Sequence, residues 1–206
     1  PANVVIDQIS GRKKAKEKLP IWFGDKRVIY PPSLNLEQSS SEKTALQKMK
    51  VAKDLGKVSR GRSTLLDLTG GFGIDSFFLS KTCKTLYFVE PDGDLIEVAQ
   101  HNHVALGVRN VYYYKTTAEL FLDSYAPSMN IDLIYLDPSR RSKDGRKIFS
   151  LSQCEPDVVR LQPKIFQSTD RLLVKASPLL DIKQGLKELE YVKKIFVVSV
   201  HNECKE

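Results

Sequence analysis

The chain has 206 residues, of which 41% are apolar and 28% charged, and its formal net charge is +7. This length supports one substantial core, so we expect one α/β domain with an appendage and not two full domains. The absence of a long apolar run and of a signal-like start predicts a soluble, cytoplasmic protein with no membrane partner. The three cysteines are widely separated and form no CxxC pair, so the sequence indicates neither a disulfide framework nor a metal site.

The basic charge is concentrated at the N-terminus. Residues 1–62 contain 14 Lys and Arg against 6 Asp and Glu. A second basic cluster interrupts a predicted loop at residues 140–147 and contains Arg140, Arg141 and Arg146. Such patches attract phosphate backbones, and we assign these three arginines to substrate binding. The alternative for the N-terminal run is a solvated surface without a partner.

Residues 1–62 are predicted to form a basic extension with a capping helix. Ser39 and Glu42 have the spacing of a capping box, apolar residues then recur at helical spacing, and Gly56 can end a helix over 39–56. The preceding residues 19–32 combine large aromatics with turn residues, which indicates an ordered segment that lies over the main domain. Residues 63–206 form the predicted core.

Short apolar runs alternate with longer helical patterns from residue 63 onward. Strands are expected at 64–68, 85–90, 111–114, 131–136, 172–176 and 195–200, and helices at 74–82, 94–106, 118–125, 156–167 and 179–189. This alternation predicts a Rossmann-like α/β fold, a parallel sheet with helices on both faces. Ligands of such sheets bind beyond the carboxyl ends of the strands.

The first strand leads into a glycine-rich turn, Asp-Leu-Thr-Gly-Gly-Phe-Gly-Ile-Asp over 67–75. Gly71 and Gly73 allow the backbone to approach a ligand where a side chain would block it. The dinucleotide fingerprint requires a third glycine, and Ser76 stands at that position. The turn therefore favours S-adenosylmethionine (SAM) over a dinucleotide. The polar residues of the same turn that we assign to this cofactor site are Asp67, Thr69 and Asp75.

Two polar residues after the next strands complete the predicted cofactor site. Glu90 ends the second strand, where a carboxylate can accept hydrogen bonds from both ribose hydroxyls. The alternative for Glu90 is a surface residue at a strand end. Thr117 follows the third strand and is assigned to the adenine amine, with a helix N-cap as the competing role.

The fourth strand ends in Asp137-Pro138, the candidate acceptor site. The pair resembles the D/N-P-P-[YFW] motif of amino-methylating enzymes, in which the acid and a proline carbonyl orient an amine. Ser139 and Arg140 replace the second proline and the aromatic residue. A guanidinium group can also stack on a base, so a nucleotide substrate remains open while amine methylation is in doubt.

Other chemistry receives less support. No cysteine follows the fourth or fifth strand, where covalent C5 methylation would need one, and Cys154 is assigned to packing. His101 and His103 lack a third ligand and are assigned to the surface. Lys175 and Ser177-Pro178, around the end of the fifth strand, are further candidates for the border of the acceptor pocket.

Several segments together resemble a bacterial family of class I SAM-dependent methyltransferases in which a THUMP-like domain and a ferredoxin-like segment follow the catalytic core. They are Leu-Pro-x-Trp from residue 19, the stretch 37–45, the turn 67–75, Asp-Pro-Ser-Arg-Arg from 137, Lys-Ala-Ser-Pro from 175, and 202–206. The resemblance spans nearly the whole chain. The resemblance implies that SAM is the cofactor and that residues 38–42 lie beside its methionine end. By analogy with THUMP domains, it also implies that the substrate is RNA.

A class I methyltransferase sheet normally includes a seventh, antiparallel strand, so we expect this chain to be a core truncated at its C-terminus, or its last strand to be supplied differently. Three functions remain open at this stage. They are an RNA methyltransferase, a small-molecule methyltransferase, and a SAM-binding or nucleic-acid-binding module without catalysis. The sequence predicts no oligomeric state.

Overall fold

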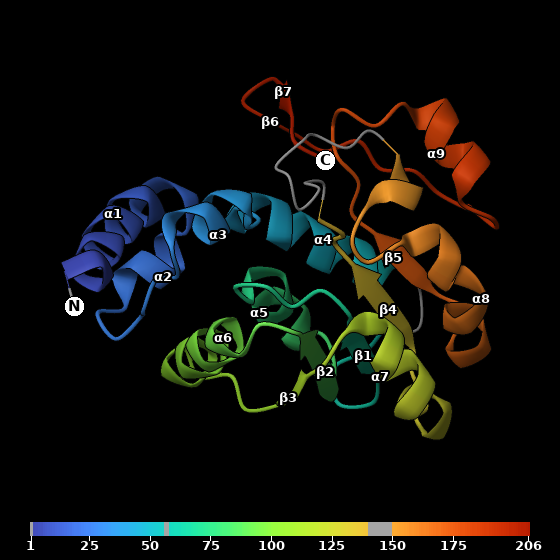
Figure 1. Ribbon diagram of the computed structural model, residues 1–206, viewed down its shortest axis with the longest axis horizontal. Coiled ribbons are helices and arrows are strands. Elements are labelled where there is room, and N and C mark those ends of the chain that lie inside the picture. The colour runs from blue at the N-terminus through green and yellow to red at the C-terminus, as the bar shows by residue number, and fades with distance from the viewer. Residues whose placement is uncertain (1, 56–57, 140–149) are drawn as a thin grey trace.

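The computed structural model describes residues 2–55, 58–139 and 150–206. Its centre is a five-stranded sheet with the order β3-β2-β1-β4-β5, in which every neighbouring pair is parallel (Figure 1). The strands are β1 (Thr64–Asp67), β2 (Thr85–Glu90), β3 (Val111–Lys115), β4 (Leu133–Leu136) and β5 (Leu172–Val174). The expected Rossmann-like α/β fold is confirmed.

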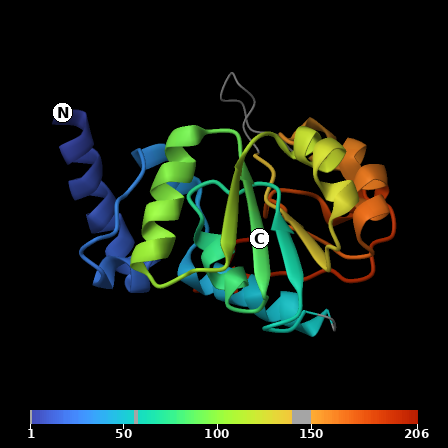
Figure 2. The same cartoon turned by 90° about the horizontal axis from the view of Figure 1, so that it is seen from below.

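One helix follows each strand, and the helices cover both faces of the sheet (Figure 2). They are α5 (Ile74–Ser80), α6 (Gly93–Ala105), α7 (Ala118–Ser124), α8 (Val158–Ser168) and α9 (Ile182–Glu188), with short 3-10 helices at Ala126–Ser128 and Leu151–Gln153. Successive side chains of a strand point to opposite faces. Leu66 accordingly packs with α7 and α8, whereas Leu65 packs with α5 and α6.

The N-terminal extension forms α1 (Ala2–Lys18), α2 (Pro20–Gly24), α3 (Ser33–Gln38) and α4 (Glu42–Asp54). The helix expected over 39–56 is shorter because Ser41, and not Ser39, is its N-cap: the Ser41 hydroxyl accepts the Thr44 N–H at 3.2 Å. Trp22 is fully buried, with its ring centroid 4.9 Å from that of Phe72. The extension therefore shares a hydrophobic cluster with the glycine-rich turn.

The prediction of a sixth strand over 195–200 in the main sheet was wrong. Only Ser199–Val200 (β6) forms a strand, and it pairs antiparallel with Glu203–Cys204 (β7) in a separate hairpin. His201 and Asn202 adopt left-handed backbone angles, φ 54° and 61°, which turn the chain back on itself. In the described residues β5 is consequently an edge of the sheet.

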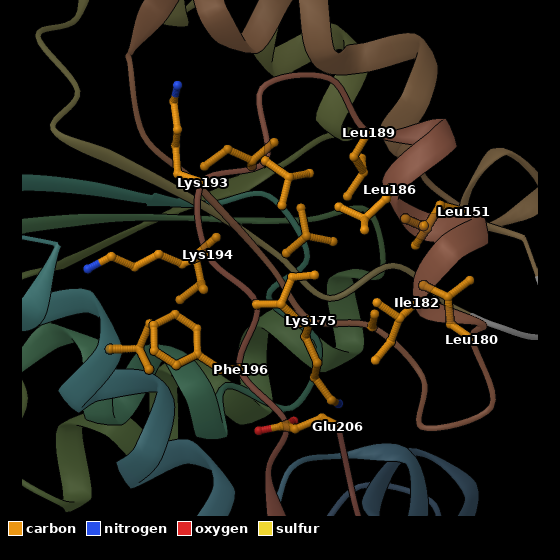
Figure 3. Close-up of a pocket in the computed structure, with 18 of the residues that line it drawn as sticks. Leu151, Lys175, Leu180, Ile182, Leu186, Leu189, Lys193, Lys194, Phe196 and Glu206 are labelled. Atoms are coloured by element: carbon orange, nitrogen blue, oxygen red, sulfur yellow. The ribbon is translucent and has the colours of Figure 1, made fainter.

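An apolar cavity of about 530 Å³ lies between β5, α9 and the C-terminal segment (Figure 3). Leucine and isoleucine side chains of α9 line one wall, and Lys175 and Glu206 approach each other at one end. No helix in the described part of the chain has the length and apolar character that crossing a bilayer requires.

Candidate active site

The glycine-rich turn connects β1 to α5 and contains two left-handed residues, Gly71 at φ 53° and Gly73 at φ 87°. A Cβ atom on Gly71 would meet only the Thr69 carbonyl oxygen, at 3.9 Å, so space is open beside this residue. A Cβ atom on Gly73 would lie 2.8 Å from Nε2 of His103 and 3.1 Å from the Cβ of Ala99. Glycine at 73 is therefore required by backbone angle and by packing against α6, a reason that the sequence did not suggest.

Glu90 lies directly beside this turn. Its Oε2 accepts the Gly71 N–H at 2.8 Å, and its Oε1 accepts the Asp92 N–H at 3.0 Å. Burial raises the pKa of Glu90, and the two N–H donors oppose that rise. The strand order of the sheet thus brings together the glycine-rich turn and the acid that the sequence assigned to one site.

Asp67 supports the turn from within the core. It is 1% exposed, its Oδ2 accepts from the Ser76 hydroxyl at 2.5 Å, and its Oδ1 accepts the Thr69 N–H at 3.0 Å. Burial raises the pKa of Asp67 to about 7. The Thr69 hydroxyl in turn accepts the Asp137 N–H at 2.7 Å, which ties the end of β1 to the end of β4. Direct contact of Asp67 or Thr69 with a ligand stays a prediction.

Asp75 is the centre of a buried polar cluster that the sequence did not reveal. Its Oδ2 accepts from the Ser40 hydroxyl at 2.7 Å and the Tyr135 hydroxyl at 2.9 Å, and its Oδ1 lies 3.2 Å from the Lys48 ammonium group. Lys48 also pairs with Glu206 at 2.8 Å. Burial alone would raise the pKa of Asp75, but the neighbouring lysines outweigh it and lower that pKa. The N-terminal extension therefore contributes charged and polar groups to this end of the sheet.

Asp137 follows β4 and forms an ion pair with Lys175, which follows β5. The Lys175 Nζ lies 2.6 Å from Oδ2 of Asp137. Burial alone would lower the pKa of Lys175, but Asp137 and Asp75 outweigh it and raise that pKa. Pro138 is buried, and Ser139 exchanges two backbone hydrogen bonds with Glu155, of 2.8 and 3.2 Å. Asp137 itself remains partly exposed at the carboxyl edge of the sheet.

The remaining predicted site residues are Thr117 and three arginines. Thr117 is the N-cap of α7, since its hydroxyl accepts the Leu120 N–H at 3.3 Å, and its contact with adenine stays a prediction. Arg140, Arg141 and Arg146 lie outside the described residues.

The prediction that His103 lies at the surface was wrong. Its side chain is fully buried, with Nε2 2.8 Å from the Gly73 carbonyl oxygen and Nδ1 2.8 Å from the Tyr113 hydroxyl. The tautomer that satisfies both contacts donates from Nε2 and accepts at Nδ1. Burial lowers the pKa of His103 to about 4, so the ring is neutral at pH 7. The four-residue spacing of Leu95, Ala99 and His103, all buried, was the signal available in the sequence.

No protein-family model matches the chain. An uncharacterized RNA methyltransferase of Halalkalibacterium halodurans is 31% identical over 100 residues, covering 48% of this chain and 22% of the relative. A protein of Streptococcus pyogenes serotype M3, also named an uncharacterized RNA methyltransferase, is 25% identical over 126 residues, covering 56% of this chain and 27% of the relative. The chain thus spans about a quarter of the length of these relatives.

Solved structures show the same architecture. A proposed methyltransferase from Porphyromonas gingivalis W83 matches 98% of this chain and 48% of its own, with a TM-score of 0.83 and 29% identity. A proposed RNA methyltransferase from Pyrococcus horikoshii matches 79% of this chain and 75% of its own, with a TM-score of 0.52 and 20% identity, a likeness that shows the fold alone. From its sheet order and these likenesses, the chain has the Rossmann-like fold of the class I SAM-dependent methyltransferases.

Proposed function

We propose that the chain is the SAM-binding core of a cytoplasmic methyltransferase that acts on RNA. The hydrogen bond between Glu90 and the Gly71 N–H carries this proposal, because it joins the carboxylate that we assign to the ribose to the glycine-rich turn. Both lie at the carboxyl ends of adjacent parallel strands, where ligands of open α/β sheets bind. A Cβ atom at Gly71 would meet only the Thr69 carbonyl oxygen within 4 Å, so a ligand can approach the backbone there.

In this proposal the cofactor contacts are divided among three strand ends. Gly71 and Gly73 line the methionine and ribose parts, Glu90 accepts hydrogen bonds from the ribose hydroxyls, and Thr117 contacts the adenine amine. Asp67, Thr69 and Asp75 complete the proposed cofactor site, and their hydrogen bonds also support the turn. SAM supplies a methyl group on a positively charged sulfur, and the protein residues orient the acceptor toward it.

Asp137 and Pro138 are the proposed acceptor residues. The backbone N–H of Asp137 donates to the Thr69 hydroxyl, which ties this residue to the glycine-rich turn, and the Asp137 side chain stays partly open to solvent. A carboxylate there accepts a hydrogen bond from the N–H or O–H group of the acceptor and aligns its lone pair. The Pro138 carbonyl is the second acceptor in this arrangement.

RNA is the proposed substrate for two reasons. The matching curated proteins are named RNA methyltransferases, and residues 1–62 carry most of the excess positive charge. We further propose phosphate contacts for Arg140, Arg141 and Arg146, and a THUMP-like domain beyond the core on the basis of sequence resemblance alone. The second candidate is a small-molecule methyltransferase, since the acceptor motif departs from the amino-methylating pattern at Ser139 and Arg140.

Incubation of the protein with isotopically labelled SAM, total RNA and, separately, a small-molecule extract tests the proposal. We expect label in RNA, and less of it as the salt concentration rises, because phosphate contacts weaken in salt. A Glu90→Ala variant, which lacks the proposed ribose contacts, is the negative control. Label confined to the small-molecule fraction would favour the second candidate, and SAM binding without any transfer would leave a non-catalytic module.

A further inference from the structure

Asp137 and Lys175, which follow β4 and β5, form an ion pair outside the proposed cofactor site. Building on the function proposed above, we infer that Lys175 is a positioning residue that holds the Asp137 carboxylate in one orientation. Lys175 would act on the acceptor only through Asp137. The relevant contact is the 2.6 Å hydrogen bond from the Lys175 Nζ to Oδ2 of Asp137.

The strand pairing places these two residues side by side. Val174 pairs with Leu136 in the parallel register of β4 and β5, and the Lys175 N–H donates to the Leu136 carbonyl oxygen at 2.8 Å. The residues that follow the two strands therefore meet at the same edge of the sheet. This backbone hydrogen bond fixes where the Lys175 side chain begins, and Figure 3 shows that side chain extending toward Glu206.

Both side chains of the Lys175–Asp137 pair are largely shielded from water. The Lys175 side chain is 12% exposed and that of Asp137 is 26% exposed. An ion pair shielded from water interacts more strongly than a pair on the open surface, and a charge-assisted hydrogen bond also fixes direction. Lys175 is therefore the more buried member of the pair, while Asp137 keeps the access to solvent that an acceptor needs.

Lys175 has three carboxylates near it, and two of them are paired with another lysine. Two other carboxylates, Asp75 and Glu206, act on Lys175, and Lys48 pairs with both of them, at 3.2 and 2.8 Å. Those two acids already have a cation of their own, whereas Asp137 hydrogen-bonds Lys175. Asp137 is thus held at Oδ2 by Lys175 and at its backbone N–H by Thr69.

A double-mutant cycle on methyl transfer tests the inference. We expect Lys175→Met to lower kcat about tenfold to a hundredfold, the rate equivalent of one hydrogen bond to a charged group, with KM for SAM unchanged. Lys175→Arg should restore part of the rate, and Lys183→Met, at an exposed lysine of α9, should have no effect. In an Asp137→Ala background, Lys175→Met should change kcat less than about twofold, because its effect passes through Asp137. If the decreases in kcat from Lys175→Met and Asp137→Ala multiply in the double variant, the inference is overturned.

A second measurement does not depend on catalysis. An ammonium group in a buried hydrogen bond exchanges its protons slowly, so Lys175 should give a lysine Nζ–Hζ resonance by nuclear magnetic resonance at neutral pH. The resonance should disappear in Lys175→Met and shift or broaden in Asp137→Asn, but not in Asp123→Asn, at an exposed residue of α7. A Lys175 resonance that neither shifts nor broadens in Asp137→Asn would refute the ion pair. If the pair is present but wild-type protein transfers no methyl group, the proposed function fails and the pairing stands.

Discussion

Replacing Asp137 with alanine is expected to lower methyl transfer about a hundredfold or more, the usual cost of removing a group that orients and stabilises the reacting atoms. Asp137 stands at the end of β4, on the proposed acceptor side, and its backbone N–H, which alanine keeps, donates to the Thr69 hydroxyl of the glycine-rich turn. The affinity for SAM should therefore be unchanged. Methyl transfer measured alongside calorimetric titration with SAM separates the two effects.

Two further variants sharpen this prediction. Asp137→Asn keeps an oxygen acceptor of similar size, so it should lose less activity than alanine but also lose the ion pair with Lys175. Asp123→Ala removes an exposed carboxylate on α7 that pairs with Lys164, and it should transfer methyl groups at the wild-type rate. Equal rates for wild type and Asp137→Ala would refute the assigned role of Asp137.

Gly73→Ala should both destabilise the protein and abolish SAM binding. The new Cβ atom would take up a left-handed backbone conformation at φ 87° and lie 2.8 Å from Nε2 of the buried His103. Left-handed strain and overpacking together are expected to lower the free energy of unfolding by about 2–5 kcal/mol. Relief of the clash requires the buried His103 ring or the turn to move, and a shift of the turn would displace Gly71 from its hydrogen bond with Glu90.

Gly107→Ala is the matched control for backbone strain. Gly107 has nearly the same backbone angle, φ 83°, but nothing lies within 4 Å of its Cβ position. This variant should lose only about 1–2 kcal/mol and bind SAM normally. Urea unfolding and SAM titration of both variants check the comparison. Equal losses of stability at the two positions would show that packing against α6 does not explain the glycine at 73.

The main sheet could be predicted because each of its strands is an apolar run between helical patterns. The expected limits of 64–68 and 85–90, for example, differ by at most one residue from those of β1 and β2. The segment 195–200 is also an apolar run, and it failed as a prediction because pairing partners are not encoded in such a run. Two left-handed residues, His201 and Asn202, instead direct it into a local hairpin.

The candidate site was predictable where it depends on strand ends. Adjacent parallel strands bring the Gly71 turn and Glu90 together, as the order of motifs in the chain suggested. The cluster around Lys48 and Asp75 was not predictable, because its members lie on elements far apart in sequence. A buried, paired lysine has no local sequence signature that separates it from a solvated one.

Isothermal titration of the protein with SAM, for wild type and for Glu90→Gln, tests most directly the claim that the glycine turn and this carboxylate form one nucleoside site. Glutamine keeps the size of the side chain but removes its charge, and its single oxygen can accept only one of the Gly71 and Asp92 N–H groups. We predict saturable binding to wild type and affinity about tenfold to a hundredfold weaker in the variant. No binding to wild type, or equal affinity in the two proteins, would contradict the claim.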